Sequence, residues 1–181
     1  MPVVDEPILA TRPTLVHAVV DVEMAGVVTE DFAELFRVHY PRLIRALQLA
    51  GVRPSEAEDI AQESFARVLR RWRQVRSGTN PPGYLFRIAF RLVRRRGLLP
   101  TSPLDEQLPS TSPPTDEQAA VKADVDRALA VMPPRRRACV VLCWMSGLTS
   151  VDAAEALGIA AGTVRKQLEL ARQQLTGELT P

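Results

Sequence analysis

Residues 55–96 read SEAEDIAQESFARVLRRWRQVRSGTNPPGYLFRIAFRLVRRR. In the first part of this stretch, apolar side chains recur at intervals of three or four, at Ala57, Ala61, Phe65, Val68 and Trp72. That spacing places them on one face of an amphipathic helix. Ser55 and Glu58 fit a capping box, which predicts that this helix begins at Ser55.

A second helix is predicted after the loop at residues 76–82, because Asn80 can cap it and Pro81 suits its first position. Its apolar face is Leu85, Ile88, Ala89, Leu92 and Val93, and its polar face is Tyr84, Arg87, Arg91, Arg94 and Arg95. No acidic residue lies between positions 81 and 96, so these arginines repel one another unless an anion lies against them. Guanidinium groups and a tyrosine ring suit phosphates and unstacked bases. A solvated charged face is the alternative interpretation.

The charge of the chain is strongly segregated, although the formal net charge of its 181 residues is only +2. Residues 31–97 carry 14 arginines against six carboxylates, and residues 132–181 carry six bases against four. Residues 1–30 and 101–131 each have a net charge of −4. Basic segments separated by an acidic one indicate a polyanionic partner.

Several classes of function find no support in the sequence. Cys139 and Cys143 are the only cysteines, and no His lies near them, so we expect buried thiols in a reducing cytoplasm and no metal site. No apolar run approaches the ~20 residues of a membrane span, and the acidic N-terminus is unlike a signal peptide. There is no His–carboxylate pair, glycine-rich phosphate loop or nucleophile motif, so we expect neither an enzyme nor a cofactor.

The sequence predicts an all-α protein with two small helical domains joined by a flexible linker. Residues 1–28 are expected to be a poorly ordered N-terminal tail, and residues 29–97 a three-helix domain. Residues 98–115 are rich in Pro, Ser and Thr and form the linker. Residues 116–181 form the second domain.

The second domain begins with two predicted helices. Val121, Val125, Leu129 and Met132 are expected to bury one side of the first. The next, at residues 134–146, is expected to bury Ala138, Val141, Leu142 and Met145. Arg135, Arg136 and Arg137 occupy its first turn, the unfavourable end of the helix dipole, and are expected on a solvated surface or against phosphate.

The end of the chain has the pattern of a helix-turn-helix. Thr149 and Asp152 form a cap signal, a short helix ends at Gly158, and a longer helix follows. The longer helix would expose Arg165, Lys166, Glu169, Arg172 and Gln173 to a DNA major groove. An αα-hairpin without DNA-binding function could produce the same pattern.

Two segments resemble a known family. AEDIAQESFARV at residues 57–68, followed by the arginine-bearing helix, resembles the promoter-melting domain of bacterial RNA polymerase sigma factors. MPPRRRACVVL at 132–142, with LGIAAGTVRKQLELAR at 157–172, resembles their domain for the minus-35 promoter element. An arrangement of two domains without a middle domain is similar to that of the extracytoplasmic-function (ECF) group of sigma factors. The chain resembles the SigE-like actinobacterial branch of this group in the segments FARVLRRWRQVR and GTVRKQLELAR.

The resemblance implies a sigma region 2-like domain at 29–97 and a sigma region 4-like domain at 116–181, which act together to recognise a promoter and open it in the cytoplasm. The implied partners are core RNA polymerase and promoter DNA, and group membership suggests an anti-sigma factor. The implied polymerase-binding residues are Glu58, Asp59, Gln62 and Glu63. The implied minus-10 residues are Ser77, Gly78, Thr79, Asn80, Tyr84, Arg87, Arg91, Arg94 and Arg95. The implied minus-35 residues are Thr163, Arg165, Lys166, Glu169 and Arg172.

The chain departs from the family pattern at four positions. The family usually has Asn at the position of Arg91 and often Asp at that of Arg95, which puts the details of minus-10 recognition in doubt. Ala160 stands where Ser or Thr usually caps the recognition helix, a cap worth about 1 kcal/mol. Leu170 stands at a position where an arginine is common in the family.

Two other functions share part of the pattern. A helix-turn-helix regulator of another class would need a ligand pocket or a phospho-acceptor in residues 29–97, and the sequence shows no sign of either. A polymerase-binding adaptor that has lost promoter selectivity would keep the acidic face of the first helix and lose the ability to open a promoter.

Overall fold

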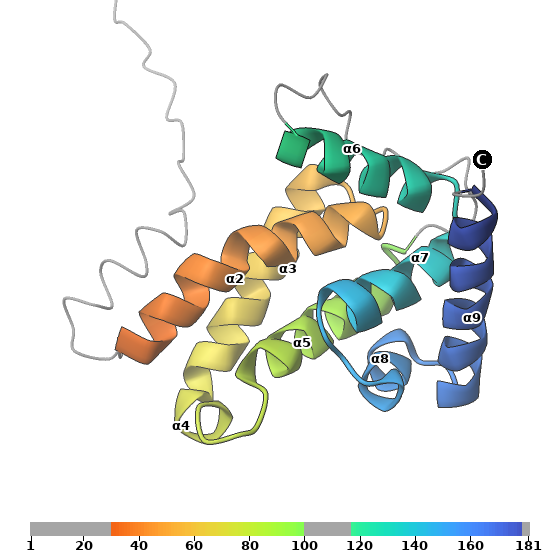
Figure 1. The fold of residues 1–181 in the computed structure, drawn as a ribbon. Helices are drawn as coiled ribbons and strands as arrows, with labels where there is room; N and C mark the ends of the chain where they lie inside the picture. Colours follow the sequence, from red (N-terminus) through yellow and green to blue (C-terminus); the bar gives the residue numbers. More distant parts are fainter. Residues whose placement is uncertain (1–29, 100–116, 179–181) are drawn as a thin grey trace, which may run out of the picture.

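The computed structural model describes residues 30–99 and 117–178. Within these two ranges the chain forms helices joined by short turns and no strand, so the predicted all-α fold is confirmed (Figure 1). The predicted tail at 1–28 and most of the predicted linker lie outside the described residues.

Four helices form the first unit: α2 (Glu30–Leu49), α3 (Pro54–Arg70), the single turn α4 (Trp72–Val75) and α5 (Pro81–Arg95). Helices α2 and α5 both pack against α3. Phe65 of α3 is fully buried, and its ring centroid lies 6.2 Å from that of Phe32 and 4.8 Å from that of Phe36, both of α2. The whole predicted apolar stripe, from Ala57 to Trp72, is buried.

The start of α3 differs from the prediction. Its N-cap is Arg53, without a side-chain capping bond, and Pro54 takes the first helical position. The predicted capping box of Ser55 and Glu58 is therefore wrong. Proline suits this position because its φ is fixed and it has no N–H to satisfy, so Ser55 falls inside the first turn.

The start of α5 agrees with the prediction. Asn80 Oδ1 accepts a hydrogen bond of 2.8 Å from the backbone N–H of Gly83, and Pro81 is the first helical residue. All five predicted apolar residues of α5 are buried. Because this face completes the core with α2 and α3, the arginines of α5 are held on the opposite side.

The second unit contains α6 (Glu117–Ala130), α7 (Pro134–Val140), the π-helical turn η2 (Val141–Met145), α8 (Ser150–Leu157) and α9 (Ala161–Glu178). Two predicted core residues are instead exposed, Val125 by 41 % and Met145 by 44 %. Helix α6 contacts α2, and within residues 123–130 it buries Ala123 and Leu129 instead of Val125. Met145 ends the wider π turn, which rotates it away from the face set by α7.

Arg137 corrects the prediction that the arginines of α7 lie on the surface. Its side chain is fully buried, and Nη2 donates a 2.9 Å hydrogen bond to the carbonyl oxygen of Met132. Arg136 donates a 2.9 Å hydrogen bond to Oε1 of Gln174 on α9. These two residues therefore support the packing of the second unit, and Arg135 alone of the three is exposed.

Helices α8 and α9 form the predicted helix-turn-helix. Thr149 Oγ1 caps α8 by accepting a 3.1 Å hydrogen bond from the N–H of Asp152, and it donates a 2.7 Å bond to Oδ2 of the same residue. Gly158 ends α8 with a left-handed φ of +68°, a conformation that glycine adopts without strain. Val164 and Ala171 of α9 are fully buried, and α9 packs on α7 and α8.

The two units lie against each other. Helix α8 packs along α5, while η2 and α6 contact α2 (Figure 1). Arg45 of α2 and Asp126 of α6 form a partly buried ion pair of 2.5 Å, a second link between the units. Among the helices of the described ranges, none combines the length and apolarity needed to cross a bilayer.

Candidate nucleic-acid interface

The polar face of α5 is where most of the predicted minus-10 residues meet. Its N-terminus borders a hollow of about 360 Å³, whose wall includes Gly78, Thr79, Asn80, Tyr84 and Arg87. The guanidinium carbon of Arg87 lies 5.2 Å from the centre of the Tyr84 ring, a cation–π distance. The structure thus brings five predicted residues to one cavity.

Ser77 is a predicted residue that does not line this hollow. Its hydroxyl donates a 3.0 Å hydrogen bond to the carbonyl oxygen of Gln74 and so holds the turn after α4.

A second hollow beside the first is lined by arginines from two helices. Arg91, Arg94 and Arg95 come from α5, Arg67 and Arg70 from α3, and Arg71 from the junction between α3 and α4. The three arginines outside α5 were not predicted as part of the site, because the prediction followed the polar face of α5 alone. Arg70 and Arg71 follow Arg67 by three and four residues, which places all three near one side of the helix end. This spacing was the feature of the sequence from which they could have been predicted.

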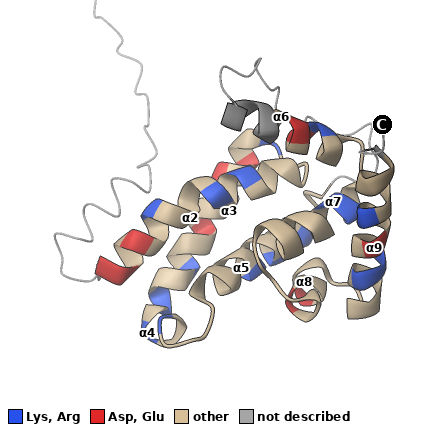
Figure 2. Ribbon diagram, in the orientation of Figure 1, with Lys and Arg blue, Asp and Glu red and all other residues tan. Residues whose placement is uncertain are grey.

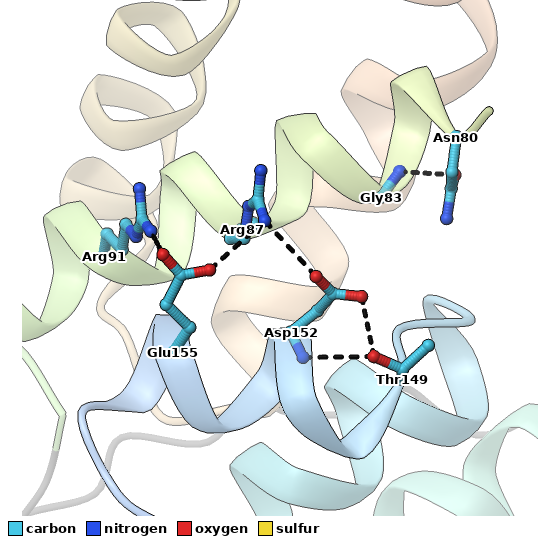
Figure 3. A network of polar contacts seen from close by, with 7 residues as sticks. All are labelled: Asn80, Gly83, Arg87, Arg91, Thr149, Asp152 and Glu155. Atoms are coloured by element: carbon cyan, nitrogen blue, oxygen red, sulfur yellow. Dashed lines mark hydrogen bonds and ion pairs between the residues drawn. The ribbon is translucent and has the colours of Figure 1, made fainter. Parts of the chain in front are cut away.

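The arginine face of α5 is partly neutralised by carboxylates of the same chain, which the sequence did not predict. Figure 3 shows Arg87 between two carboxylates of α8, with Nη1 at 3.3 Å from Oδ1 of Asp152 and 3.2 Å from Oε2 of Glu155. Arg91 also forms an ion pair with Glu155. These partners were not predicted because they are more than sixty residues away in the sequence, beyond the reach of any local pattern.

These interdomain ion pairs are only partly shielded from water. The side chains of Asp152 and Glu155 are 40 % and 49 % exposed, so each pair contributes roughly 0–1 kcal/mol. Nε of Arg87 is buried, and no atom of the described residues accepts a hydrogen bond from it. The ion pairs between α5 and α8 are therefore modest in strength, and they leave one hydrogen-bond donor of Arg87 without a partner among the described residues.

Helix α9 presents the predicted minus-35 face to solvent. Arg165, Lys166, Glu169 and Arg172 are exposed, and Thr163 is half-buried at the start of the helix. Arg172 has local partners, because its Nη1 lies 3.1 Å from Oε2 of Glu169 and its guanidinium carbon 5.9 Å from the Trp144 ring centre. No acid of the described residues pairs with Arg165 or Lys166, so they are the bases of α9 most available to a phosphate or a base edge.

The predicted polymerase-binding residues lie on the outer side of α3. Glu58 and Asp59 are exposed, whereas Gln62 and Glu63 are half-buried. Glu63 forms ion pairs with Arg67 and with Arg96, which follows α5. Glu63 therefore links α3 to the end of α5, and the freely exposed carboxylates of this face are Glu58 and Asp59.

The described residues contain no group of three His, Cys, Asp or Glu side chains close enough to hold a metal ion. Cys139 is buried, and burial raises the pKa of its thiol to about 12. A thiol with that pKa stays protonated at neutral pH, so it packs as a small apolar side chain.

Comparisons with known proteins match both units of the chain. Residues 35–96 match the family model for Sigma-70 region 2, and residues 122–175 match that for Sigma-70 region 4. The ECF RNA polymerase sigma factor SigE of Mycolicibacterium smegmatis is 38 % identical over 153 residues, which cover 78 % of this chain and 59 % of that protein. The RNA polymerase sigma-E factor of Streptomyces coelicolor is 32 % identical over 157 residues, covering 82 % and 86 %.

Solved structures show the same fold at lower sequence identity. The sigma factor RpoE of Bartonella quintana, solved in complex with the anti-sigma factor NepR, has a TM-score of 0.55 and 22 % identity; the match covers 84 % of this chain and all of that one. CnrH, solved in complex with the cytosolic domain of CnrY, has a TM-score of 0.52 and 21 % identity, covering 89 % and 95 %. With both regions matched in order and relatives above 30 % identity, the chain belongs to the ECF group of sigma-70 family factors, beside the SigE-like proteins of actinobacteria.

Proposed function

We propose that this protein is a promoter-specificity factor that binds core RNA polymerase, recognises minus-35 and minus-10 elements, and promotes strand opening. The observation that carries the proposal is the cavity at the start of α5, which joins a loop, an aromatic ring and a row of arginines in one unit that lies beside a helix-turn-helix. The factor performs no chemistry itself, and it acts in the cytoplasm, where bacterial transcription takes place.

The minus-10 element binds at the α4–α5 turn and along α5. A base flipped out of the duplex enters the hollow of about 360 Å³, a size within the usual range of small-ligand pockets. Gly78, Thr79 and Asn80 surround it and Tyr84 offers a stacking surface. Flipping costs a few kcal/mol, which stacking and phosphate neutralisation can offset without ATP.

The melted strand continues along the arginine hollow. Arg91, Arg94 and Arg95 of α5 line it together with Arg70 and Arg71 at the end of α3. None of Arg70, Arg71, Arg94 and Arg95 forms an ion pair with an acid of the described residues, so their charge remains available for backbone phosphates.

The minus-35 element binds to α9, whose exposed face enters the major groove. Arg165 and Lys166 contact base edges or phosphates near the start of the helix, with Thr163 beside them. Arg172 and Glu169, which pair with each other, lie one turn or two further along.

The outer side of α3 binds core polymerase through Glu58 and Asp59, and Gln62 contributes from a half-buried position. Glu63 supports this surface from behind through its ion pairs with Arg67 and Arg96.

Reconstitution with core RNA polymerase tests the proposal directly. We expect the purified chain plus core polymerase to initiate transcription at defined positions on genomic DNA, with permanganate-reactive thymines appearing just upstream of each start. Binding to core without opening of any duplex would contradict the proposal and favour a polymerase-binding adaptor. Core polymerase alone is the control.

Replacing Arg87 and Arg91 together by Ala should slow promoter opening by at least about tenfold, because two charge-assisted contacts of about 1.5–3 kcal/mol each are lost. Closed-complex formation should change less, since α9 is untouched. Opening kinetics by permanganate footprinting and closed-complex affinity by filter binding separate the two steps. The matched control is the double variant Arg37→Ala and Arg73→Ala, which removes the same charge from exposed positions outside both hollows; equal losses in both steps would count against the assignment.

Arg165→Ala should weaken discrimination in the upstream element by about 1–3 kcal/mol per base pair contacted. Arg172→Ala should have a smaller effect, because Arg172 already has partners in Glu169 and Trp144. Selection of bound sequences from a randomised upstream element measures both, with the exposed Arg127→Ala on α6 as control. An unchanged preference for Arg165→Ala would show that α9 faces DNA with another side.

A further inference from the structure

The two hollows beside α5 adjoin each other. Arg71 and Tyr84 line both the hollow of about 360 Å³ at the start of α5 and the arginine hollow, which has a volume of about 670 Å³. Figure 2 shows basic residues on α5 and toward the end of α3, and acidic residues on α8 beside α5. A ligand that spans the junction therefore meets an aromatic and polar environment at one end and a strongly basic one at the other.

The arginine hollow concentrates positive charge more densely than a single DNA strand carries negative charge. No acidic side chain lines it, and four of its arginines form no ion pair with an acid of the described residues: Arg70, Arg71, Arg94 and Arg95. A strand brings one charge per nucleotide. A nucleoside triphosphate carries roughly four charges on three adjacent phosphates, because its terminal phosphate has a second pKa near 6. The triphosphate therefore matches the unpaired arginines, which can bind its oxygens in bidentate fashion.

The first hollow contains groups that can hold both the face and the edge of a base. Tyr84 offers its ring for stacking. Asp152 of α8 lines the same hollow, and its carboxylate is oriented from two sides (Figure 3). Thr149 Oγ1 donates a 2.7 Å hydrogen bond to Oδ2, and Nη1 of Arg87 lies 3.3 Å from Oδ1. Each carboxylate oxygen can accept two hydrogen bonds, so both oxygens keep the capacity to accept one from a ligand.

These polar groups favour guanine over adenine. Guanine has two neighbouring donors on its Watson–Crick edge, the N1–H and N2 amino groups, which a carboxylate can accept together. Adenine presents the acceptor N1 at that place, which a carboxylate repels. Asn80 uses its Oδ1 to accept from the N–H of Gly83, so its amide N–H groups are left to donate to a ligand acceptor such as guanine O6.

We propose that the two hollows together form a binding site for a free guanine nucleoside triphosphate. The base lies against Tyr84 and Asp152, and the phosphates lie among the arginines of the second hollow. The site itself does not require DNA. It uses groups that the proposed function assigns to the promoter strand, so nucleotide and strand compete for them; this competition alone rests on the proposed function.

The first test measures binding of a ribose-labelled fluorescent GTP analogue to the full-length chain, without DNA or polymerase, in buffer lacking divalent cations. Unlabelled GTP should displace the analogue at least about fivefold more effectively than ATP, because ATP loses the paired contact with Asp152. Guanosine and inorganic tripolyphosphate should each compete weakly, since each fills one hollow only. Displacement by ATP or tripolyphosphate as strong as that by GTP, or no binding of the analogue, would overturn the proposal.

Substitutions in the two hollows should have separable effects. The double variant Arg70→Ala and Arg94→Ala should weaken GTP binding by at least about tenfold, because two charge-assisted contacts with phosphate are lost. Its matched control is Arg37→Ala with Arg73→Ala, which removes the same charge from exposed positions outside both hollows. Asp152→Asn should bring the ratio of GTP to ATP affinity close to one, because an amide presents a donor beside its acceptor.

Circular dichroism verifies that each of these variants is folded. Equal losses of GTP binding in the two double variants would overturn the phosphate position. An unchanged preference for GTP in the folded Asp152→Asn variant would overturn the base position.

The second test links the site to the promoter strand. GTP should displace a fluorescein-labelled single-stranded oligothymidylate from the full-length chain, and binding of GTP without displacement would overturn the shared site. If the Arg70 and Arg94 double variant loses GTP binding while strand binding and promoter opening are unchanged, the nucleotide site stands and the strand-holding role of the arginine hollow is wrong. If the same variant loses strand binding and keeps GTP binding, the nucleotide site is wrong and the proposed function stands.

Discussion

Helix α5 packs its apolar face on α2 and α3 and pairs its arginines with carboxylates of α8. The rest of the structure depends on these two interactions. Its apolar face, with Leu85, Ala89 and Val93 almost fully buried, completes the core formed with α2 and α3. This packing fixes the rotation of the helix about its axis, so Arg87, Arg91 and Arg94 cannot turn away from the surface. A fixed row of guanidinium groups needs anions, and in this structure α8 supplies two of them.

Local sequence patterns predicted the elements that local forces determine. The stripe around Phe65, the Asn80 cap of α5 and the glycine-ended α8 were all correct, because each depends on residues within one or two turns. The capping box at Ser55 failed because two start signals competed and Pro54 prevailed. Met145 was misplaced because a π turn changes the helical period in a way that no residue of the sequence announces.

Most residues of the candidate site were predicted from the sequence, but the residues from other elements that contact them were not. The hollow beside α5 gathers Gly78, Thr79 and Tyr84 as expected, since they are close in sequence. The same hollow is also lined by Arg71, which follows α3, and by Asp152 of α8 in the other unit. Contacts between distant segments depend on tertiary packing, which periodicity does not encode.

The structure shows the contacts of two residues at which this chain departs from the family pattern, Arg91 and Arg95. Arg91 pairs with Glu155, so this position contributes to the contact between the two units as well as to the basic surface. Arg95 remains exposed at the rim of the arginine hollow and has no acidic partner among the described residues. The same row of charges thus meets carboxylates of α8 in this structure, and we propose that it binds a DNA strand in the transcription complex.

The distance between the two units in the free protein and in the polymerase complex tests this account most directly. Asp152 of the second unit and Arg71 of the first line one hollow, so the residues next to them report on the distance between the units. Spin labels on Cys residues introduced at Arg73 and Val151 measure this distance by double electron–electron resonance. The Cys143→Ala substitution removes the partly exposed native thiol. Cys139 is buried with a raised pKa and should escape labelling. We expect one short, narrow distance distribution for the free protein and a longer distance after core polymerase is added. A broad, long distribution in the free protein that core polymerase leaves unchanged would contradict the account.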